Sequence, residues 1–229
     1  MKLSRHQIAA RVAQDIPDGS YVNLGIGLPT LIADFLPEDR QVILHTENGM
    51  LGMGRAAAPG EEDANLINAG KVYVTEEPGA AYFHHADSFA MMRGGHLDFC
   101  VMGALQVSTR GDLANWRTTS PTAIPGVGGA MDLAVGAKHV FVVMELFTRS
   151  GDCKLVEDCT YPLTAAECVE RVYTDVAIFA PDPEGLRVLE IFDDVDLETL
   201  SHQVCLPLLD GRGSAPTEQR AALVPDSSS

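Results

Sequence analysis

The sequence carries little positive charge for its length. Its 229 residues include 16 Lys and Arg against 32 Asp and Glu, which gives a formal net charge of −16. Proteins that bind nucleic acid or anionic membranes need a basic face that displaces counterions, and this chain has no run of Lys or Arg. We therefore expect neither nucleic acid nor a membrane surface among its partners.

Long apolar runs and paired cysteines are also missing. The most apolar run, at residues 140–144, is far too short to span a bilayer. Residues 1–6 lead into a charged amphipathic stretch rather than the apolar core of a signal peptide. The five cysteines form no CxxC pair, and their odd number argues against a disulfide framework. We expect a cytoplasmic protein in which Cys100 and Cys168 are buried thiols.

Aromatic residues make up only 6% of the chain, whereas glycine occurs 21 times. This balance is typical of a sheet with tight strand-to-helix turns. Strands of β-branched residues alternate with helical segments, which predicts an α/β fold with a mostly parallel sheet covered by helices. No repeat or linker divides the sequence, so we expect one domain over residues 1–229, with a flexible tail at about 220–229.

Capping signals and hydrophobic patterns predict the individual elements. A capping box that begins at Ser4 opens a helix ending near Pro17, and a second box at Thr164 predicts a short helix towards Arg171. A further helix is expected at residues 30–36. Strands are expected at residues 21–24, 41–46, 71–75, 98–102, 139–144, 174–179 and 186–191.

Three glycine-rich turns lie at or near the ends of predicted strands, at residues 25–27, 49–54 and 126–130. None is a dinucleotide-binding fingerprint, because Thr30 and Met131 stand where a third glycine is needed, and no Gly-Lys-Ser/Thr follows to make a P-loop. Ligands of open α/β sheets bind beyond the carboxyl ends of the strands. Each turn alone is explained by the tolerance of glycine for positive φ, but the three together favour a binding site.

Glu47 stands directly after the predicted strand 41–46 and before the turn pair Asn48-Gly49. The turn does not need an acidic residue, since Asn-Gly forms turns by itself. Charged side chains at strand ends are mostly exposed, so position alone favours a surface carboxylate. The sequence around Glu47 changes this interpretation.

Residues 46–54 read Thr-Glu-Asn-Gly-Met-Leu-Gly-Met-Gly and resemble the Ser-Glu-Asn-Gly motif of the β subunits of 3-oxoacid CoA transferases. Thr46 replaces the serine of the family and keeps its hydroxyl group. Further matches follow the order of the family from about residue 3 to about residue 207, and such an ordered set is far more specific than one glycine motif. They are residues 23–30, 59–63, 66–71, 87–98, 111–116, 127–133 and 136–138.

The resemblance implies the coenzyme A transferase fold and a ping-pong transfer of CoA between carboxylic acids. Glu47 is then the nucleophile and carries CoA as a covalent glutamyl-CoA thioester, so CoA is a substrate and an intermediate, and neither a metal nor another cofactor is required. The backbone N–H groups of Gly129 and Ala130 are the expected oxyanion donors. A partner α subunit is implied, commonly in an α2β2 assembly. The pocket for CoA and substrate is expected to include Asn23, Gly25, Gly27, Asn48 and Gly128.

The identity of the carboxylic acid that receives CoA is predicted from three segments, residues 82–89, 159–164 and 168–175. They look most like the members of the family that transfer CoA from succinyl-CoA to 3-oxoadipate, in aromatic-ring degradation through protocatechuate or catechol. Both acids are dicarboxylates, so the carboxylate that does not react needs a cation or a hydrogen-bond donor. The candidates for this contact are His84, His85 and Arg93.

Alternatives stay open at this point. The same Glu47 chemistry serves acetoacetate, and a non-catalytic binding subunit is conceivable because related sugar-phosphate and initiation-factor folds share this architecture. A metal at His84 and His85 is disfavoured, since zinc needs three or four converging ligands. His45 is interpreted as structural, and Trp116 as a packing residue or a stacking surface for adenine.

Overall fold

The computed structural model describes residues 2–213 except 69, 121, 123, 193 and 194. The tail predicted at about 220–229 lies outside the described residues. The helical elements are α1 (Arg5–Asp15), the 3₁₀ helix η1 (Leu28–Phe35), α2 (His85–Arg93), α3 (Ala130–Gly136) and α4 (Leu197–Val204).

Most strands belong to one large sheet. Its members are β1 (Tyr21–Leu24), β2 (Ile43–Thr46), β3 (Met50–Ala56), β4 (Val74–Tyr82), β5 (Phe99–Met102), β8 (His139–Val143), β10 (Val169–Tyr173), β11 (Ala177–Asp182), β12 (Gly185–Ile191) and β13 (Leu208–Asp210). A small second sheet contains β6 (Gln106–Ser108), β7 (Leu113–Ala114) and β9 (Leu155–Val156). The strand orders are β13-β12-β11-β10-β8-β5-β1-β2-β3-β4 and β7-β6-β9.

The centre of the large sheet is parallel. Strands β2, β1, β5, β8 and β10 pair in parallel with their neighbours in this series. Antiparallel strands extend both ends, β3 and β4 on one side and β11 and β12 on the other, and β13 pairs in parallel with β12. The prediction of an α/β fold with a mostly parallel sheet covered by helices is confirmed. Parallel strands end at the same edge, so the turns after β1 and β2 lie close together.

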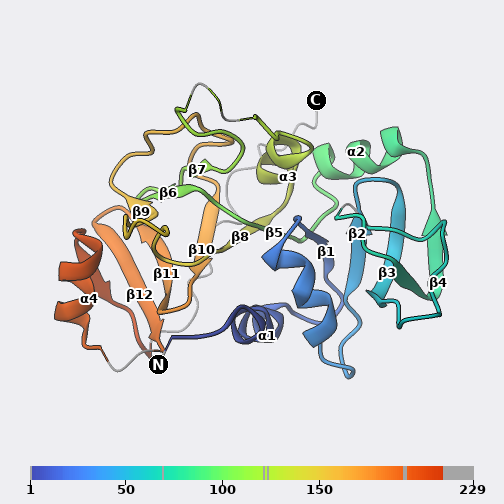
Figure 1. The fold of residues 1–229 in the computed structure, drawn as a ribbon, viewed down its shortest axis with the longest axis horizontal. Coiled ribbons are helices and arrows are strands. Elements are labelled where there is room, and N and C mark those ends of the chain that lie inside the picture. Colours follow the sequence, from blue (N-terminus) through green and yellow to red (C-terminus); the bar gives the residue numbers. More distant parts are fainter. Residues whose placement is uncertain (1, 69, 121, 123, 193–194, 214–229) are drawn as a thin grey trace, which may run out of the picture.

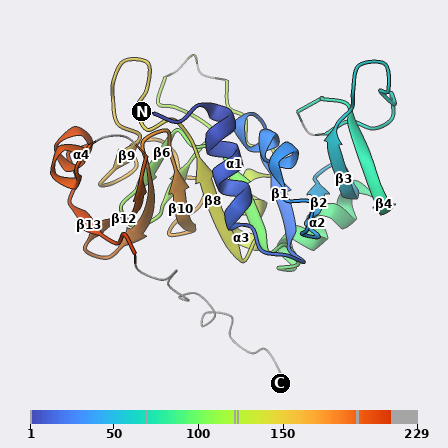
Figure 2. The same ribbon diagram turned by 90° about the horizontal axis from the view of Figure 1, so that it is seen from below.

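Side chains of the central strands alternate between two cores. In β5, Phe99 and Val101 belong to the core formed with α1 and η1, whereas Cys100 and Met102 belong to the core formed with α2 and α3. Figures 1 and 2 show these two helix pairs on opposite faces of the sheet. Burial on both faces explains why the central strands are almost continuously apolar in sequence.

Helix α1 is capped locally at its start and hydrogen-bonded to the sheet at its end. It begins with the predicted capping box, in which Ser4 and Gln7 satisfy each other's backbone N–H groups. Its last residue, Asp15, accepts hydrogen bonds from Arg171 Nη1 (3.0 Å) and from the hydroxyl of Tyr173 (2.7 Å) in β10. Because Tyr173 is fully buried, these bonds hold the end of α1 against the sheet.

The helix predicted from Thr164 towards Arg171 is wrong. Thr164 Oγ1 donates a hydrogen bond to Asn115 Oδ1 (2.6 Å) and accepts one from the backbone N–H of Asn115 (3.1 Å). The hydroxyl is therefore engaged by a distant loop and caps no helix, and strand β10 begins at Val169. The capping-box pattern does not distinguish a local partner from one far along the chain.

The other predicted segments overlap the observed elements. The segments 21–24, 41–46, 98–102, 139–144 and 186–191 correspond to β1, β2, β5, β8 and β12, and the segment 30–36 corresponds to η1. The segment 71–75 covers only the start of the long strand β4. The segment 174–179 is interrupted, because Thr174 Oγ1 accepts a hydrogen bond from the N–H of Ala177 (3.0 Å) in a turn before β11.

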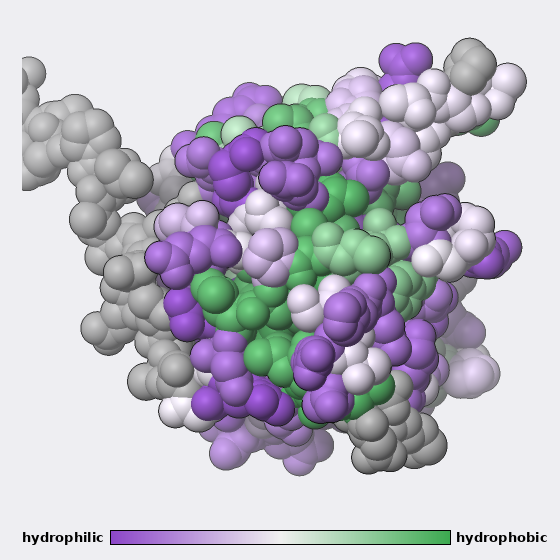
Figure 3. All heavy atoms as spheres, turned by 90° about the vertical axis from the view of Figure 1, so that its left-hand side faces the viewer, coloured by the Kyte–Doolittle hydropathy of each residue, from purple (hydrophilic) through white to green (hydrophobic). Residues whose placement is uncertain are grey.

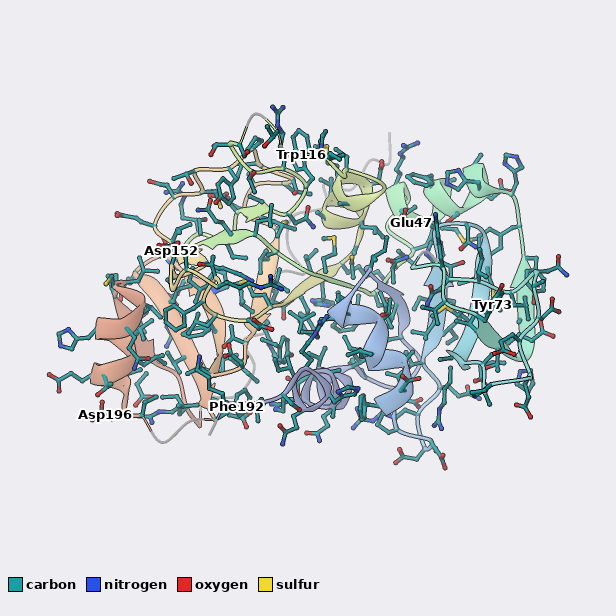
Figure 4. All side chains as sticks on the ribbon, in the orientation of Figure 1. Glu47, Tyr73, Trp116, Asp152, Phe192 and Asp196 are labelled. Carbon is teal, nitrogen blue, oxygen red and sulfur yellow. The ribbon has the colours of Figure 1, made fainter. Side chains whose placement is uncertain are left out.

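The end of the molecule at α4 and β13 carries apolar side chains that pack only partly against the core. They include Leu197, Leu206 and Leu208. Figure 3 views this end and shows an apolar area surrounded by hydrophilic residues. This end lies far from Glu47, which is at the opposite side of the view in Figure 4.

Helices α2 and α3 touch so closely that only glycine fits at one point, which yields a prediction. A Cβ atom added at Gly136, at the end of α3, would overlap the backbone carbonyl oxygen of Met92 in α2. We expect Gly136→Ala to lower the free energy of unfolding by about 1–3 kcal/mol, because the helices must separate to admit the methyl group. Urea unfolding measures this change.

The matched control is Gly103→Ala, since a Cβ at Gly103 meets nothing within 4 Å. It should unfold close to the wild-type midpoint. A Gly136→Ala midpoint that equals the wild-type value would contradict the close packing of α2 and α3.

Candidate active site

Glu47 lies at the carboxyl end of β2, in the tight turn that leads into β3. Thr46 ends β2, and its hydroxyl accepts a hydrogen bond from the backbone N–H of Met50 (3.1 Å), which closes the turn. Gly49 has φ of 108°, and a Cβ atom there would collide with the carbonyl oxygen of Phe83. The sequence Thr-Glu-Asn-Gly therefore folds as a compact hairpin turn that presents Glu47 above the sheet edge, near α2 and α3 (Figure 4).

The carboxylate of Glu47 packs directly against the backbone of Gly129, the residue that precedes α3. A Cβ atom added at Gly129 would lie 2.9 Å from both Cδ and Oε2 of Glu47. The backbone N–H of Gly129 donates a hydrogen bond to this carboxylate. The third glycine-rich turn of the sequence thus meets the Glu47 turn, although more than eighty residues separate them.

Several groups set the pKa of Glu47. Partial burial is the largest influence and raises the pKa above its ordinary value of 4.5. The Gly129 hydrogen bond and the nearby His85 ring oppose this effect, whereas the Asp132 carboxylate adds to it. The net direction is upward, so the structure holds a carboxylate that water solvates less well than a surface glutamate.

A pocket opens beside Glu47 at the ends of β1 and β2. Its lining includes the predicted residues Asn23, Gly25 and Glu47. Gly25 keeps the turn after β1 tight against β5, because its N–H donates to the Val101 carbonyl (2.8 Å) and an added Cβ would lie 3.1 Å from the same oxygen. The complete lining is Asn23, Leu24, Gly25, Ile26, Thr30, His45, Thr46, Glu47, Met53 and Asn68.

A buried polar network lies under this pocket. Asn23 Nδ2 lies 3.0 Å from His45 Nδ1 and also donates to the His45 carbonyl oxygen (3.2 Å). His45 Nε2 lies 3.0 Å from Ser88 Oγ in α2, and Ser88 Oγ donates to the carbonyl oxygen of Thr46 (3.1 Å). Burial lowers the pKa of His45 to about 4, so the ring is neutral at pH 7. The network ties α2 to the strand that carries Glu47.

The remaining predicted pocket residues have more peripheral positions. Asn48 is exposed, and its Nδ2 donates to the carbonyl oxygen of Ile67 (3.1 Å), which anchors a neighbouring loop. Gly27 has φ of 97° and precedes η1, and Gly128 has φ of 49°. The N–H of Ala130 donates to the Val127 carbonyl (3.1 Å). Of the two predicted oxyanion donors, the N–H of Gly129 is thus the one that faces Glu47.

His84, His85 and Arg93, the candidates for binding the distal carboxylate of the substrate, differ in the contacts that they already make within the chain. His84 caps α2, since its Nδ1 accepts from the N–H of Ala86 (3.1 Å). Arg93 is paired with Asp132 (Nε to Oδ1, 2.6 Å), and 64% of its side chain is exposed. His85 is the candidate that acts electrostatically on Glu47.

Other sequence interpretations concern groups outside this cluster. Trp116 Nε1 donates to the carbonyl oxygen of Leu163 (3.1 Å), which agrees with a packing role. Cys100 and Cys168 are buried, as predicted. Burial, and then the nearby Glu47, raise the pKa of the Cys100 thiol far above its ordinary range, so Cys100 is no thiolate nucleophile.

The described residues contain neither a metal cluster nor a membrane span. Among them, no group of three or more His, Cys, Asp or Glu side chains is arranged to hold a metal ion. No helix in this same part of the chain has the length and apolar character needed to cross a membrane.

Sequence reasoning missed the polar network. Asn23 and His45 are neighbours in the register of two parallel strands, and Ser88 lies on α2, which no pattern in the sequence predicted. The signal that was available is the polar character of Asn23 and His45 within otherwise apolar strands. Buried polar residues of this kind need partners, and here they find each other.

Comparisons with solved structures support the fold. An acyl-CoA transferase from Escherichia coli O157:H7 in a thioester complex with CoA has a TM-score of 0.67, 18% sequence identity, and coverage of 92% of this chain and 43% of that one. The decarboxylase AibA/AibB has a TM-score of 0.64, 18% identity, and coverage of 89% of this chain and 84% of that one. At these identities the likeness concerns the fold alone, and the two proteins are named for different reactions.

Sequence comparisons are more specific. The coenzyme A transferase family model matches residues 5–191. The B subunit of the 3-oxoadipate CoA-transferase of Pseudomonas putida is 60% identical over 208 residues, which are 91% of this chain and 97% of that protein. The B subunit of a probable succinyl-CoA:3-ketoacid coenzyme A transferase of Bacillus subtilis is 46% identical, with coverage of 86% and 91%. Together with the Glu47 turn and its glycine neighbours, these matches show that the chain belongs to the coenzyme A transferase family and resembles its B subunits.

Proposed function

We propose that this chain is the catalytic B subunit of an enzyme that moves CoA from succinyl-CoA to 3-oxoadipate, with Glu47 as the nucleophile. The observation that carries the proposal is the half-buried Glu47 carboxylate, held against the Gly129 N–H at the carboxyl edge of the sheet. A surface carboxylate at a strand end has no reason to pack against the glycine turn before α3. An attacking group needs such fixed positioning, which contributes about 7–11 kcal/mol in favourable cases.

The proposed reaction exchanges one thioester for another. The Glu47 carboxylate attacks the acyl carbonyl of succinyl-CoA, which forms an anhydride between Glu47 and succinate and releases the CoA thiolate. The thiolate attacks the Glu47 carbonyl, which forms the glutamyl-CoA thioester and releases succinate. The carboxylate of 3-oxoadipate attacks this thioester, and the same two steps in reverse yield 3-oxoadipyl-CoA and regenerate Glu47.

The surroundings of Glu47 support this chemistry. Attack by a carboxylate creates an oxyanion on the attacked carbonyl, and a backbone N–H aimed at it is worth about 3–4 kcal/mol. The Gly129 N–H already faces the Glu47 carboxyl group and is therefore placed to donate when that group becomes the thioester carbonyl under attack. Burial keeps the carboxylate poorly solvated, which makes it a stronger nucleophile once ionised.

The similarity values favour 3-oxoadipate as the acceptor. The relative named for 3-oxoadipate is 60% identical, whereas the relative named for 3-ketoacids in general is 46% identical. We propose that His85 contacts the distal carboxylate, since His84 is engaged as a helix cap and Arg93 is paired with Asp132. Acetoacetate is the second candidate, and it lacks a distal carboxylate for His85 to bind.

A partner A subunit completes the proposed enzyme. The compared relatives are named as B subunits, and a chain of net charge −16 is by itself a poor host for the phosphates of CoA. Apolar side chains are exposed close to the pocket, with Ile26 at 67% and Ile67 at 38% exposure. We propose that the whole chain acts as one domain in a cytoplasmic α2β2 enzyme of aromatic-ring degradation, with CoA as substrate and no metal or other cofactor.

The covalent intermediate gives the direct test of the function. Incubation of the assembled A and B subunits with succinyl-CoA should add one CoA, with loss of water, to the peptide that contains Glu47. Mass spectrometry detects this adduct. Glu47→Gln should form no adduct and should lose transfer to 3-oxoadipate almost completely. Full turnover in Glu47→Gln would overturn the proposal. If the wild-type enzyme transfers CoA faster to acetoacetate than to 3-oxoadipate, acetoacetate replaces 3-oxoadipate as the proposed acceptor.

The folding of Glu47→Gln can be verified by its stability. The pKa of Glu47 is raised in the folded chain, so ionisation of this group disfavours the native state. The penalty is present above the folded pKa and vanishes below 4.5, where the carboxyl group is protonated in both states. Glu47→Gln should therefore unfold at or above the wild-type temperature at pH 7, and the difference should disappear in acid.

A second prediction concerns the contact with Gly129. In Gly129→Ala the added methyl group would press on the Glu47 carboxylate, whose flexible side chain can move away without unfolding the protein. A displacement of this size should lower kcat by about 100-fold with little change in the unfolding midpoint. Steady-state kinetics measures the effect.

The matched control lies in the same turn. Gly126→Ala introduces a methyl group that meets nothing within 4 Å, and Gly126 does not have a positive φ. It should retain wild-type kcat. Equal rates for Gly129→Ala and Gly126→Ala would remove the Gly129 contact from the mechanism.

The acid limb of the pH–rate profile should move in opposite directions in two variants. His85 lowers the pKa of Glu47, so His85→Gln should raise that pKa and move the acid limb of kcat/KM to higher pH. Asp132 raises the pKa of Glu47, so Asp132→Asn should move the limb to lower pH. Asp87→Asn, which removes another acid from the start of α2, serves as the control and should leave the limb in place. Shifts in the same direction would contradict this account of the Glu47 environment.

A further inference from the structure

The polar network under the pocket has an unusual feature at Asn23. Asn23 and His45 are paired in the register of β1 and β2, and Ser88 of α2 lies over His45. All three side chains are almost completely buried, with exposures of 2%, 2% and 0%. Within the described residues, Asn23 Oδ1 is buried and accepts no hydrogen bond. Such an orphaned acceptor is rare, because it loses water without gaining a partner.

The orientation of the Asn23 amide follows from the hydrogen atoms of the network. Ser88 Oγ donates its only hydrogen to the Thr46 carbonyl oxygen, so it is an acceptor towards His45. His45 Nε2 therefore carries the hydrogen, and Nδ1 of the neutral ring is an acceptor. Asn23 must turn its NH₂ group towards Nδ1.

A second contact fixes the same orientation. Asn23 Nδ2 also donates to the carbonyl oxygen of His45. If the amide turned over, Oδ1 would face two acceptors at about 3 Å, the ring nitrogen and the carbonyl oxygen. The series of hydrogen bonds from Thr46 through Ser88 to His45 thus keeps the Asn23 amide in one orientation, with its oxygen directed away from His45.

The orphaned oxygen belongs to a residue that lines the pocket next to Glu47. Asn23, His45 and Glu47 all contribute to this pocket. The side-chain nitrogen of Asn23 is already hydrogen-bonded to His45. The side-chain oxygen Oδ1 is therefore the polar atom of Asn23 that is available to bind a ligand. A carbonyl-type oxygen repels a developing oxyanion, so Asn23 is unsuited to be an oxyanion donor. Its chemistry matches a ligand that brings an N–H or O–H group.

We propose that Asn23 Oδ1 accepts a hydrogen bond from a donor of the acyl-CoA substrate, and that His45 and Ser88 are positioning residues that keep this oxygen turned away from the His45 ring and without a partner among the described residues of the chain. The inference rests on the proposed function and names a contact within it. Two groups of the substrate have the required chemistry near the reacting carbonyl. One is the amide N–H of the CoA arm nearest the sulfur, and the other is the enol O–H of a 3-oxoacyl group.

Substrate analogues test the contact in the assembled two-subunit enzyme. In one analogue an ester oxygen replaces the amide N–H nearest the CoA sulfur, which removes a donor and preserves the shape. If this N–H is the donor, the wild-type enzyme should show a kcat/KM about tenfold lower for this analogue of succinyl-CoA, as expected for one lost hydrogen bond. Asn23→Leu, which is similar in size but has no acceptor, should use the analogue and normal succinyl-CoA equally well.

The two possible donors give different results. If the amide N–H is the donor, Asn23→Leu lowers kcat/KM equally for succinyl-CoA and 3-oxoadipyl-CoA. If the enol O–H is the donor, only 3-oxoadipyl-CoA is affected, because succinyl-CoA has no 3-oxo group. Unchanged kcat/KM values for both substrates in Asn23→Leu would overturn the proposal.

Ser88→Ala provides a second variant, in case Asn23→Leu folds poorly. Without Ser88 the hydrogen of His45 can move to Nδ1, where it repels the NH₂ group of Asn23 and leaves the His45 carbonyl oxygen as the contact that holds the amide. Ser88→Ala should therefore weaken the discrimination shown by the wild-type enzyme, although Ser88 is remote from the substrate. Retained discrimination in Ser88→Ala would contradict the positioning role. The CoA adduct on Glu47 should still form in every variant, so failure of this inference is distinguishable from failure of the proposed function.

Discussion

The structure depends on one close contact, between the Glu47 carboxylate and the backbone of Gly129. A side chain at the end of β2 and a glycine before α3 can meet only if β1, β2 and β5 are parallel neighbours and α3 lies over their carboxyl ends. The missing Cβ of Gly129 allows the approach, and its N–H compensates for part of the solvation that the carboxylate loses. The two glycine turns and the acidic residue therefore form one structural unit.

The rest of the fold holds this contact in place from two sides. On one side, α2 and α3 touch at Gly136 and Met92, which fixes the end of the short helix α3 relative to α2. On the other side, Ser88 of α2 reaches the Thr46 carbonyl, immediately before Glu47. A shift of α2 would thus move both the glycine backbone and the strand end.

Local chemistry explains which features were predictable from sequence. Glu47, Gly25 and Gly129 carry recognisable motifs, and the structure places them around one pocket edge. The capping pattern at Thr164 predicted a helix that does not form, because the Thr164 hydroxyl binds Asn115, a partner 49 residues away. The Asn23–His45–Ser88 network depends on the register of two parallel strands and on the position of α2, and neither is encoded in a local pattern. Prediction of local structure therefore succeeded where a short segment determines its own geometry, and it failed at Thr164 and in the polar network, where distant segments determine the geometry jointly.

The most direct test of the central claim is the titration of Glu47 itself. Carbon NMR of protein labelled at the glutamate carboxyl carbon, with the resonance assigned by its loss in Glu47→Gln, reports the pKa of this group. The account predicts a value above the ordinary 4.5, with a further rise in His85→Gln, because burial outweighs the Gly129 hydrogen bond. A pKa at or below 4.5 would contradict it, since that value describes a carboxylate solvated by water rather than held against the glycine backbone.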